Sequence, residues 1–504
     1  MSSRLDAVRR ERELDALSRE RVDVLVVGGG VTGCGIALDA ASRGLSVALV
    51  EKDDLAFGTS RWSSKLVHGG LRYLATGDVG IAWESALERR TLMTTTAPHL
   101  VRPLPMVVPL GTDVSPRQGM LVDAGHRSAD VLRRSSRTSA RVLPPPRRLG
   151  RVETQRLVPG VRREGLRGGL LNWDGQLEDD ARLVVALARS AAALGASILT
   201  RVRYDGEGRL VDALTGASLQ PRATTVVNAT GAWADTISPG VRLQPSKGVH
   251  LVLDAAQLGR PTASMTVPVP SQPNRYVFAL PHPDGLVYVG LTDDPLDGPL
   301  PEVAVAEEHE ISFLLDTLNR GLERPLSRAD VLGTFAGVRP LVAGEQGITA
   351  DLSRRHLVTL DDGLLTVLGG KLTTYRKMAQ DAVDRLTDVP CRTTTLPLVG
   401  AGAVNRAELA AAGPAAARLV RRYGSEAPDV AALAATDPAL LEPVIDGAPV
   451  LGVELVWGLV AEGALCAEDL LERRTRLSLV DAWAAAARPV VERRVAEVHA
   501  GGRA

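Results

Sequence analysis

Short apolar runs and a helical segment alternate near the start of the chain. Residues 23–27 read DVLVV, residues 46–51 read SVALVE, and the helical pattern between them ends at Gly44. Short, mostly apolar runs are typical of strands buried in a parallel sheet. The order strand, helix, strand therefore predicts a βαβ unit that opens a Rossmann-like α/β domain.

Further along, the pattern changes to alternating strands and then to helices. Residues 178–194 predict a helix with an acidic first turn that ends before Gly195. Residues 245–297 alternate short strand patterns with turns rich in proline, glycine and aspartate, which indicates an inserted antiparallel sheet. A strand, a turn and a helix are predicted over 363–386, and from about residue 395 the chain is alanine-rich and helical.

Two segments lack a clear place in this scheme. Residues 1–21 alternate acidic and basic side chains with a few apolar positions, which predicts a short amphipathic helix in a solvated extension. Residues 133–165 are rich in arginine, serine and proline, with three consecutive prolines at 144–146. Because proline excludes regular structure, we expect this segment to be a long connection or a mobile flap.

The composition excludes several classes of protein. Lysine plus arginine and aspartate plus glutamate number 59 each among 504 residues, so no nucleic-acid partner is indicated. Three isolated cysteines form neither a disulfide framework nor a metal-binding spacing, so we expect a reducing cytoplasm and no metal. The N-terminus lacks the apolar core of a signal peptide, and no apolar run reaches the roughly 18 residues of a membrane span.

The glycine motif Gly28-x-Gly30-x-x-Gly33 follows the first strand and opens the first helix. Glycines there permit a tight turn and close approach of a pyrophosphate to the helix N-terminus. Glu51 ends the second strand about 20 residues later, where a carboxylate accepts hydrogen bonds from ribose hydroxyls. The motif alone is a weak signal, but in this context it predicts binding of NAD or FAD.

Two further turns favour FAD over NAD. NATGA at 228–232 and GGKLT at 369–373 each follow a predicted strand, where small residues let the main chain lie against a flat ligand. Each could be an ordinary tight turn. A buried flavin ring needs several such backbone approaches, however, and three of them favour FAD.

The segment SSKLVHGGLRYL, residues 63–74, fits neither a half-buried strand nor a surface helix. It combines adjacent glycines with a lysine, a histidine, an arginine and a tyrosine. Adjacent glycines beside cationic and titratable side chains indicate that something approaches this segment closely.

The motifs in order resemble the FAD-dependent glycerol-3-phosphate dehydrogenase family. They are GGGVTGCGIALDAASRGLSVALVE, SSKLVHGGLRYL, APHLVRPLPMVVP, DDARLV, NATGAWAD, GVRPL and GGKLTTYRKMA, with GALCAEDLLERRTRLSLVD in the C-terminal part. The resemblance implies a Rossmann-like FAD/NAD(P)-binding domain, an inserted antiparallel β substrate domain and a C-terminal helical domain. It also implies hydride transfer from C2 of sn-glycerol 3-phosphate to flavin N5, which yields dihydroxyacetone phosphate, with electrons passed to a membrane quinone such as menaquinone.

This resemblance divides the chain into parts and assigns cofactor residues. It implies that Ser63, Ser64 and Lys65 line the FAD, and that Gly69 and Gly70 keep the chain clear of its ring. We expect an extension over 1–21, an oxidoreductase domain over 22–395 and a helical domain over 396–504. FAD binding falls mainly on 22–100, 165–240 and 333–390, and substrate binding on 100–165 and 240–332. The expected FAD-binding residues are Gly28, Gly30, Val31, Thr32, Gly33, Glu51, Lys52, Thr59, Ser60, Ser63, Ser64, Lys65, Leu66, His68, Gly70, Val202, Ala229, Gly231, Gly337, Gly370, Lys371, Leu372 and Thr373.

The substrate phosphate requires cations, and alcohol oxidation requires a base. Arginine recognises phosphate oxygens in a bidentate manner, although most single arginines are surface charges. A neutral histidine is the obvious base, although a strand histidine is often structural. The resemblance implies that the strand with His250 faces the flavin, so we rank His250 first as the base and His68 second. The expected substrate-binding residues are Arg72, Tyr73, Arg339, Arg354 and Lys371, with Arg339 also near the chemistry.

Several alternatives remain open at this stage. The same substrate could reduce O2 in an oxidase, the fold could serve an amine or amino-acid oxidase, or the protein could be a flavin-binding sensor without activity. Cys34 lies at the pyrophosphate helix, so we expect non-covalent FAD. A quinone acceptor implies a location at the inner membrane surface. The candidates for contact with the membrane are the basic stretches at 133–148 and 473–476 and the C-terminal tail. The tail could instead pack on its own domain, and a homodimer is also open.

Overall fold

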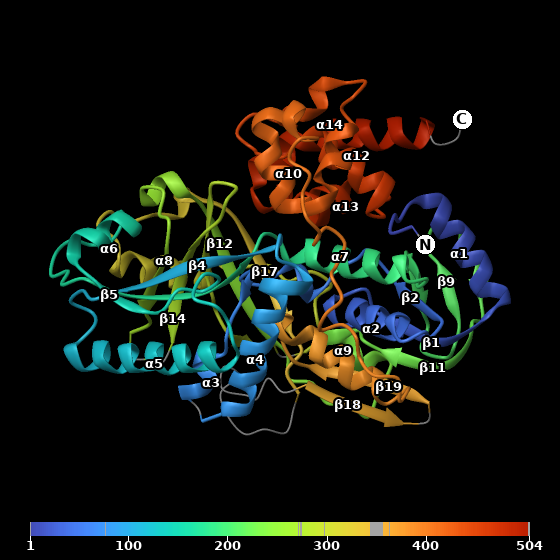
Figure 1. Cartoon of the computed structure of the whole chain (residues 1–504), viewed down its shortest axis with the longest axis horizontal. Helices are drawn as coiled ribbons and strands as arrows, with labels where there is room; N and C mark the ends of the chain where they lie inside the picture. The colour runs from blue at the N-terminus through green and yellow to red at the C-terminus, as the bar shows by residue number, and fades with distance from the viewer. Residues whose placement is uncertain are drawn as a thin grey trace.

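A computed structural model describes residues 2–75, 77–270, 272, 275–296, 298–342, 356–361 and 363–501, without the side chains of Arg72 and Ala75. Its described elements form two large sheets, a small third sheet and a helical C-terminal part (Figure 1). The small sheet contains β8 (Val202–Tyr204), β9 (Leu210–Asp212) and β10 (Ser218–Leu219). The fold confirms the predicted class, an α/β nucleotide-binding architecture with a largely antiparallel second sheet and C-terminal helices.

The first sheet contains the predicted βαβ unit. Its strand order among the described residues is β18 (His356–Asp361), β19 (Leu364–Gly369), β11 (Arg222–Asn228), β1 (Arg21–Val27), β2 (Val47–Glu51) and β7 (Ser197–Thr200). All neighbours are parallel except β18 and β19. Helix α2 (Val31–Ser42) contacts both α7 (Asp180–Ala193) and α9 (Tyr375–Val383). Small residues make this packing close, since a Cβ on Gly35 would lie 3.0 Å from the Tyr375 ring.

The second sheet is predominantly antiparallel. Its strands, in spatial order, are β16 (Asp294–Pro295), β12 (Ser246–Asp254), β15 (Leu286–Gly290), β14 (Tyr276–Pro281), β13 (Ser264–Pro268), β4 (Val101–Pro109), β6 (Gly169–Leu177) and β3 (Leu66–Val67). Strand β17 (Val331–Arg339) pairs with β12, and β5 (Arg147–Leu149) pairs with β6. Helix α8 (Glu308–Arg320) covers one face of this sheet, where its buried leucines join the core.

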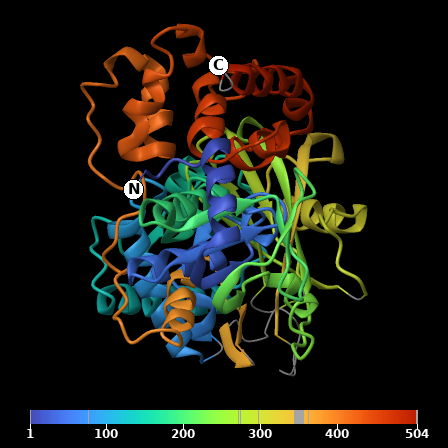
Figure 2. The ribbon, with the colours of Figure 1, turned by 90° about the vertical axis from the view of Figure 1, so that its right-hand side faces the viewer.

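The C-terminal helices lie on one side of the molecule, above α7 (Figures 1 and 2). They are α10 (Ala416–Tyr423), α11 (Ala427–Ala432), α12 (Gly452–Ala461), α13 (Ala467–Asp469) and α14 (Asp481–Gly501). Ala487 and Val491 of α14 are buried against the same domain, so the tail packs on its own helices. None of the helices in the described ranges combines the length and apolar character that a membrane crossing requires.

Two segments differ from their sequence-based predictions. The N-terminal helix α1 (Ala7–Arg19) is packed rather than solvated, because Arg10 donates to Asp212 at 2.5 Å and Arg9 donates to the Ala192 carbonyl at 3.0 Å. Residues 133–165 are not a single irregular flap. They include the end of α5 (Pro116–Ser135), then β5, and then α6 (Arg151–Leu157).

The basic stretch 473–476 is a clear correction. The sequence made it a candidate for a membrane surface, but Arg473, Arg474 and Arg476 are buried and paired with carboxylates. A buried arginine in an ion pair is unavailable to lipid headgroups. The local run of charge could not reveal this, because its partners lie in distant parts of the chain.

Candidate active site

A cavity of about 1590 Å³ is lined by residues of both large sheets and of the turns beside them. Its wall takes residues from the β1–α2 turn, from the segment that follows β2, from β12 and β14, and from the turns after β11, β17 and β19. This volume exceeds the roughly 300–1,000 Å³ typical of small-molecule pockets. The cavity therefore has room for an extended dinucleotide and a small substrate together.

At one end of the cavity, the glycine motif brings main chain against main chain. Gly28 has φ +114°, and a Cβ there would lie 2.6 Å from the Ala229 carbonyl oxygen. A Cβ on Gly33 would lie 1.9 Å from the Gly28 carbonyl oxygen, so Gly33 serves helix–strand packing. Gly30 is the N-cap of α2 and provides no side chain to its first N–H groups. These N–H groups and the helix dipole form an anion site.

Glu51 lies beside this turn, as the spacing predicted. Its carboxylate accepts hydrogen bonds from the Gly29 N–H at 2.6 Å and the Asp53 N–H at 2.9 Å. Burial raises the pKa of Glu51 despite these two bonds. A buried carboxylate at the end of β2 is suited to accept hydrogen bonds from the ribose hydroxyls of a dinucleotide.

The residues present fit FAD. The turn at Gly28 has no space for a Cβ. The turn after β11 has φ +64° at Gly231, and the turn after β19 has φ +69° at Gly369 and +75° at Gly370. Gly337 adds a further close approach, because a Cβ there would lie 2.8 Å from the Trp62 Cβ. These main-chain approaches along one long cavity suit a cofactor with a flat ring at one end and a nucleotide at the other.

The segment after β2 forms the middle of the wall. The Ser60 hydroxyl accepts from the Val31 N–H at 2.9 Å, which ties this segment to the start of α2. Ser63 donates from its N–H and its hydroxyl to Asp180 at 2.9 and 2.8 Å. Asp180 belongs to the DDARLV motif, so a residue of this motif positions Ser63 of the SSKLVHGGLRYL motif.

Lys65 differs from its expected place. Its side chain does not line the cavity; the ammonium is buried 3.3 Å from Asp180 and lies 4.6 Å from the Phe335 ring centroid. The reason is the backbone, since φ is +55° at Lys65 and the chain turns there. Burial lowers the pKa of Lys65, opposed by Asp180.

Gly69 and Gly70 also have a different role from the one expected. A Cβ on Gly69 would lie 2.3 Å from Arg89, and one on Gly70 would lie 2.8 Å from the Ala82 Cα. Both contacts are with α4 (Val79–Thr91). The two glycines therefore let this segment pack on a helix, and neither of them lines the cavity.

His250 is a buried side chain of β12 in the cavity wall. Its Nε2 lies 2.8 Å from the Ser64 hydroxyl, and its ring stacks on Phe335 at 4.6 Å between centroids. Its Nδ1 is buried and has no hydrogen-bond partner among the described residues. Burial, with the charges of Lys65 and Arg339, lowers the pKa of His250 well below its usual value. The imidazole is therefore neutral at pH 7.

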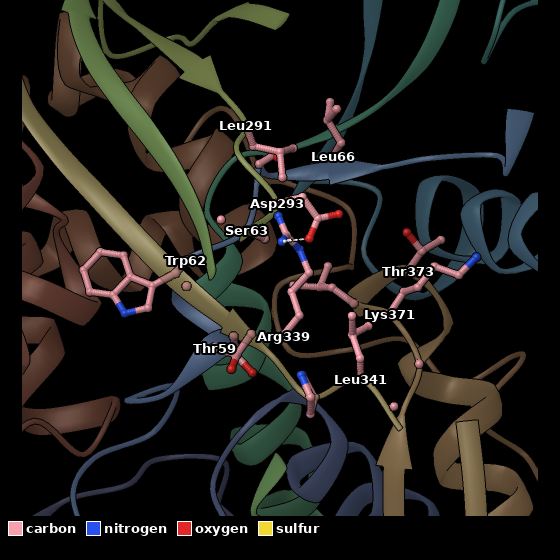
Figure 3. A pocket seen from close by; sticks show the side chains of 18 of the residues that line it. Thr59, Trp62, Ser63, Leu66, Leu291, Asp293, Arg339, Leu341, Lys371 and Thr373 are labelled. Atoms are coloured by element: carbon pink, nitrogen blue, oxygen red, sulfur yellow. Dashed lines mark hydrogen bonds and ion pairs between the residues drawn. The ribbon is translucent and has the colours of Figure 1, made fainter. Parts of the chain in front are cut away.

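Arg339 lies on the same face of β12 as His250. Gly248 and His250 alternate by two along the strand, and the Arg339 guanidinium lies across Gly248, 2.1 Å from where its Cβ would be. The guanidinium donates to Asp293 at 2.8 Å (Figure 3). It also donates to the Ser246 hydroxyl at 3.1 Å. A planar, oriented guanidinium in a cavity wall is a ready anion-binding group.

Lys371 lines the cavity but extends toward α4. Its ammonium donates to the Ser85 hydroxyl at 2.6 Å and lies 4.0 Å from the centroid of the Tyr73 ring. The ring of Tyr73 in turn stacks near His68, at 6.3 Å between centroids. The side chain of Arg72 and the whole of Arg354 lie outside the described residues.

Most other predicted cofactor residues also line the cavity. This set is Gly28, Gly30, Val31, Thr32, Glu51, Lys52, Thr59, Ser60, Ser63, Ser64, Leu66, His68, Val202, Ala229, Gly231, Gly337, Gly370, Lys371, Leu372 and Thr373. Gly33, Lys65 and Gly70 do not line it, for the packing reasons given above.

Some cavity residues escaped the sequence reasoning. Asp293 pairs with Arg339, and Arg275, Tyr276 and Phe278 line the wall from β14 and the turn before it. The paired aspartates of GLTDD were visible as a turn signal. Only the pairing of β12 with β15 and β17 brings them to Arg339.

Comparisons with known proteins agree with this site. A family profile described as FAD dependent oxidoreductase matches residues 23–376, and one described as C-terminal domain of alpha-glycerophosphate oxidase matches residues 391–500. Glycerol-3-phosphate dehydrogenase 1 of Mycobacterium tuberculosis is 50% identical over 495 residues, covering 95% of this chain and 96% of the relative. The Synechocystis glycerol-3-phosphate dehydrogenase is 33% identical, covering 93% and 91%.

Among solved structures, the glycerol-3-phosphate dehydrogenase of Bacillus halodurans complexed with FAD is similar, with a TM-score of 0.74 and 28% identity. The match covers 97% of this chain and 94% of that one. The fold and the site define an FAD-dependent oxidoreductase, and the chain belongs to that family. Within it, the chain is a member of the glycerol-3-phosphate dehydrogenases.

Proposed function

We propose that this chain oxidises sn-glycerol 3-phosphate to dihydroxyacetone phosphate with non-covalent FAD. The observation that carries the proposal is the shared face of β12, where the Arg339 guanidinium and the neutral His250 ring line one cavity. Oxidation of a phosphorylated secondary alcohol needs a cationic group for the phosphate and a base for the hydroxyl proton in one cavity. The membership in the dehydrogenase family supports the same substrate.

The residues divide the work between binding and proton transfer. Arg339 binds the substrate phosphate, and Asp293 and Ser246 orient its guanidinium. His250 accepts the proton of the C2 hydroxyl at Nε2 or Nδ1, with Ser64 steering the ring through its hydroxyl. When bound, FAD supplies the two-electron oxidant. Lys371, Tyr73 and His68 also line the cavity. Arg72 and Arg354 are further candidates for binding the substrate phosphate.

An anaerobic titration tests the substrate. The yellow holoenzyme should lose its flavin absorption when glycerol 3-phosphate is added, and should keep it with glycerol or with amino acids. The Arg339→Met variant should need about 100-fold more substrate for the same bleaching, because a charge-assisted bidentate contact is lost. Arg328→Ala removes an exposed arginine paired with Glu308 and serves as the control. Bleaching by amino acids alone would contradict the proposal.

We further propose a membrane quinone as the electron acceptor, at the cytoplasmic face of the membrane. Part of the cavity wall is apolar and includes Leu71, Leu74, Leu121, Val122 and Phe278. It reaches α5, on which Met120, Leu121 and Val131 are 60%, 66% and 63% exposed. Met120 and Val131 are about three turns apart and so share a face. Exposed arginines accompany them on the same helix: Arg117, Arg127 and Arg134.

Vesicle binding and acceptor assays test this second proposal. The holoenzyme should sediment with anionic vesicles, and Met120→Glu with Val131→Glu should abolish this without loss of activity toward a soluble dye. Val305→Glu, at an exposed position before α8, is the matched control.

Menaquinone analogues should be reduced faster than O2. Faster formation of hydrogen peroxide would indicate an oxidase, and sedimentation equilibrium would decide whether the protein is a homodimer.

A further inference from the structure

A short segment of the C-terminal helical domain, residues 472–476, packs against the segment that follows β2. Asp54, three residues after Glu51, is fully buried between the two. Arg473 donates to it from Nε at 2.7 Å, and Arg474 donates from both terminal nitrogens at 2.8 Å. Arg474 also donates to the Glu462 carbonyl oxygen at 2.9 Å, which anchors it within the helical domain. A charged network of this kind joins the helical domain to the nucleotide-binding sheet.

The same C-terminal segment contacts the next residues of the wall. Glu472 pairs with Arg61, and Arg476 donates to the Arg61 carbonyl oxygen at 2.6 Å. The Arg61 guanidinium lies over the Trp62 ring at 4.3 Å and the Phe57 ring at 5.1 Å from their centroids. The Arg476 guanidinium also lies over the Trp62 ring, 5.1 Å from its centroid.

The opposite surface of these residues lines the cofactor cavity. Phe57, Gly58, Thr59, Ser60, Trp62, Ser63 and Ser64 all contribute to its wall. Segment 54–64 contains only one short 3-10 turn, Thr59–Arg61, so strand pairing does not hold its main chain. Its shape depends on contacts from both sides, with Ser60 tied to α2 on the inner side and Asp54 and Arg61 tied to the helical domain on the outer side.

We propose that the C-terminal helical domain is a cofactor-retention device, in which Arg473, Arg474 and Arg476 are positioning residues that hold segment 54–64 in its FAD-binding shape. These arginines do not line the cavity, so they act through Asp54, Arg61 and Trp62. Loss of one partner leaves a buried charge unpaired, which shifts the segment and weakens the site. This role concerns binding of FAD and does not depend on which substrate or acceptor the enzyme uses.

The test measures FAD binding to the stripped full-length chain by quenching of flavin fluorescence. Arg474→Met should raise the Kd for FAD at least about tenfold, a typical size for coupling between sites. Arg474→Lys should recover part of the affinity, because it restores the charge but not the bidentate contact. Arg189→Met is the matched control, because Arg189 joins α7 to Glu426 of the helical domain at 2.6 and 2.7 Å, in contacts that involve neither Asp54 nor Arg61.

A second variant keeps the proposal falsifiable if Arg474→Met does not fold. Glu472 is partly exposed and bonds Arg61 and Arg473, so Glu472→Gln should fold and raise the Kd for FAD by about threefold. Folding of each variant is checked by circular dichroism. The proposal is overturned if the folded variants bind FAD like the parent chain. It is also overturned if Arg189→Met weakens FAD binding as much as Arg474→Met does.

Discussion

His250 shows how neighbours in a sheet set the chemistry of one side chain. Phe335, directly opposite on β17, stacks on the imidazole and removes water from one side. The positive charges of Lys65 and Arg339 add to this burial, and together they keep the pKa of His250 well below its usual value. A histidine in this state is neutral at pH 7, as the proposed general base must be.

The first prediction concerns this histidine and pH. His250→Asn should lower kcat by about 10² to 10⁴, the usual contribution of a general base, and leave FAD bound. In the parent enzyme, the base is neutral above its lowered pKa, so kcat at saturating substrate should show no acid limb at the ordinary histidine pKa of about 6.5 and should fall only at lower pH. His356→Asn, which removes a histidine paired with Asp381 outside the cavity wall, is the control. An acid limb centred near pH 7 would contradict this account.

The turn between β1 and α2 shows how a single element creates a binding surface. Gly28, Gly30 and Gly33 serve different ends, since the first two border the cavity and the third only lets helix and strand approach. The conformation at Gly28, with φ +114°, is one that other residues rarely adopt. The anion site is therefore a product of backbone shape and not of charged side chains.

The second prediction tests this element. Gly33→Ala should reduce FAD content of the purified protein at least about tenfold, because its Cβ would meet the Gly28 carbonyl oxygen at 1.9 Å and open the turn. Gly80→Ala is the control, since Gly80 has no atom within 4 Å of its added Cβ and lies in α4. This control should keep its FAD and gain up to about 0.5 kcal/mol in the free energy of unfolding. Full flavin content in Gly33→Ala would refute the role assigned to the turn.

At the scale of the whole molecule, buried ion pairs join the helical domain to the rest. Arg182 pairs with Glu462, Arg422 with Asp179, and Arg473 and Arg474 with Asp54. Burial opposes ionisation of Asp54, but Arg474 and Arg473 hold its pKa below the usual value. Such pairs are strongly destabilising to break, because one charge is left buried alone.

The third prediction follows from the sign of this shift. A carboxylate with a lowered pKa stabilises the fold above its unfolded pKa of about 4, and this contribution is lost as pH falls through the lower folded value. The Tm of Asp54→Asn should therefore lie below that of the parent chain by a constant amount from pH 8 to about 5. The gap should close only below about pH 4. Differential scanning calorimetry measures it, and Asp15→Asn, in an exposed pair with Arg19, should show no gap. A gap that closes between pH 7 and pH 5 would be inconsistent with the lowered pKa.

Local pattern determined much of this protein. The run DVLVV, the glycine motif and the helix that follows predicted the βαβ unit and its dinucleotide site, because strand, turn and helix depend on side chains close together in the chain. The turn-rich segment 245–297 likewise predicted the second sheet. For Arg339 and His250, the residue types alone were insufficient, and the family resemblance supplied the expectation of phosphate binding and base chemistry.

Tertiary structure alone decided where several of these side chains lie. Lys65 turns away to Asp180, and Arg339 meets Asp293 through strand pairing. Arg473 and Arg474 belong to a run that the sequence suggested as a surface charge, yet they are buried on Asp54, about 420 positions away. The physical reason is that spacing encodes the period and turns of the backbone. The partner of a charge, in contrast, is set by whichever distant segment packs against it.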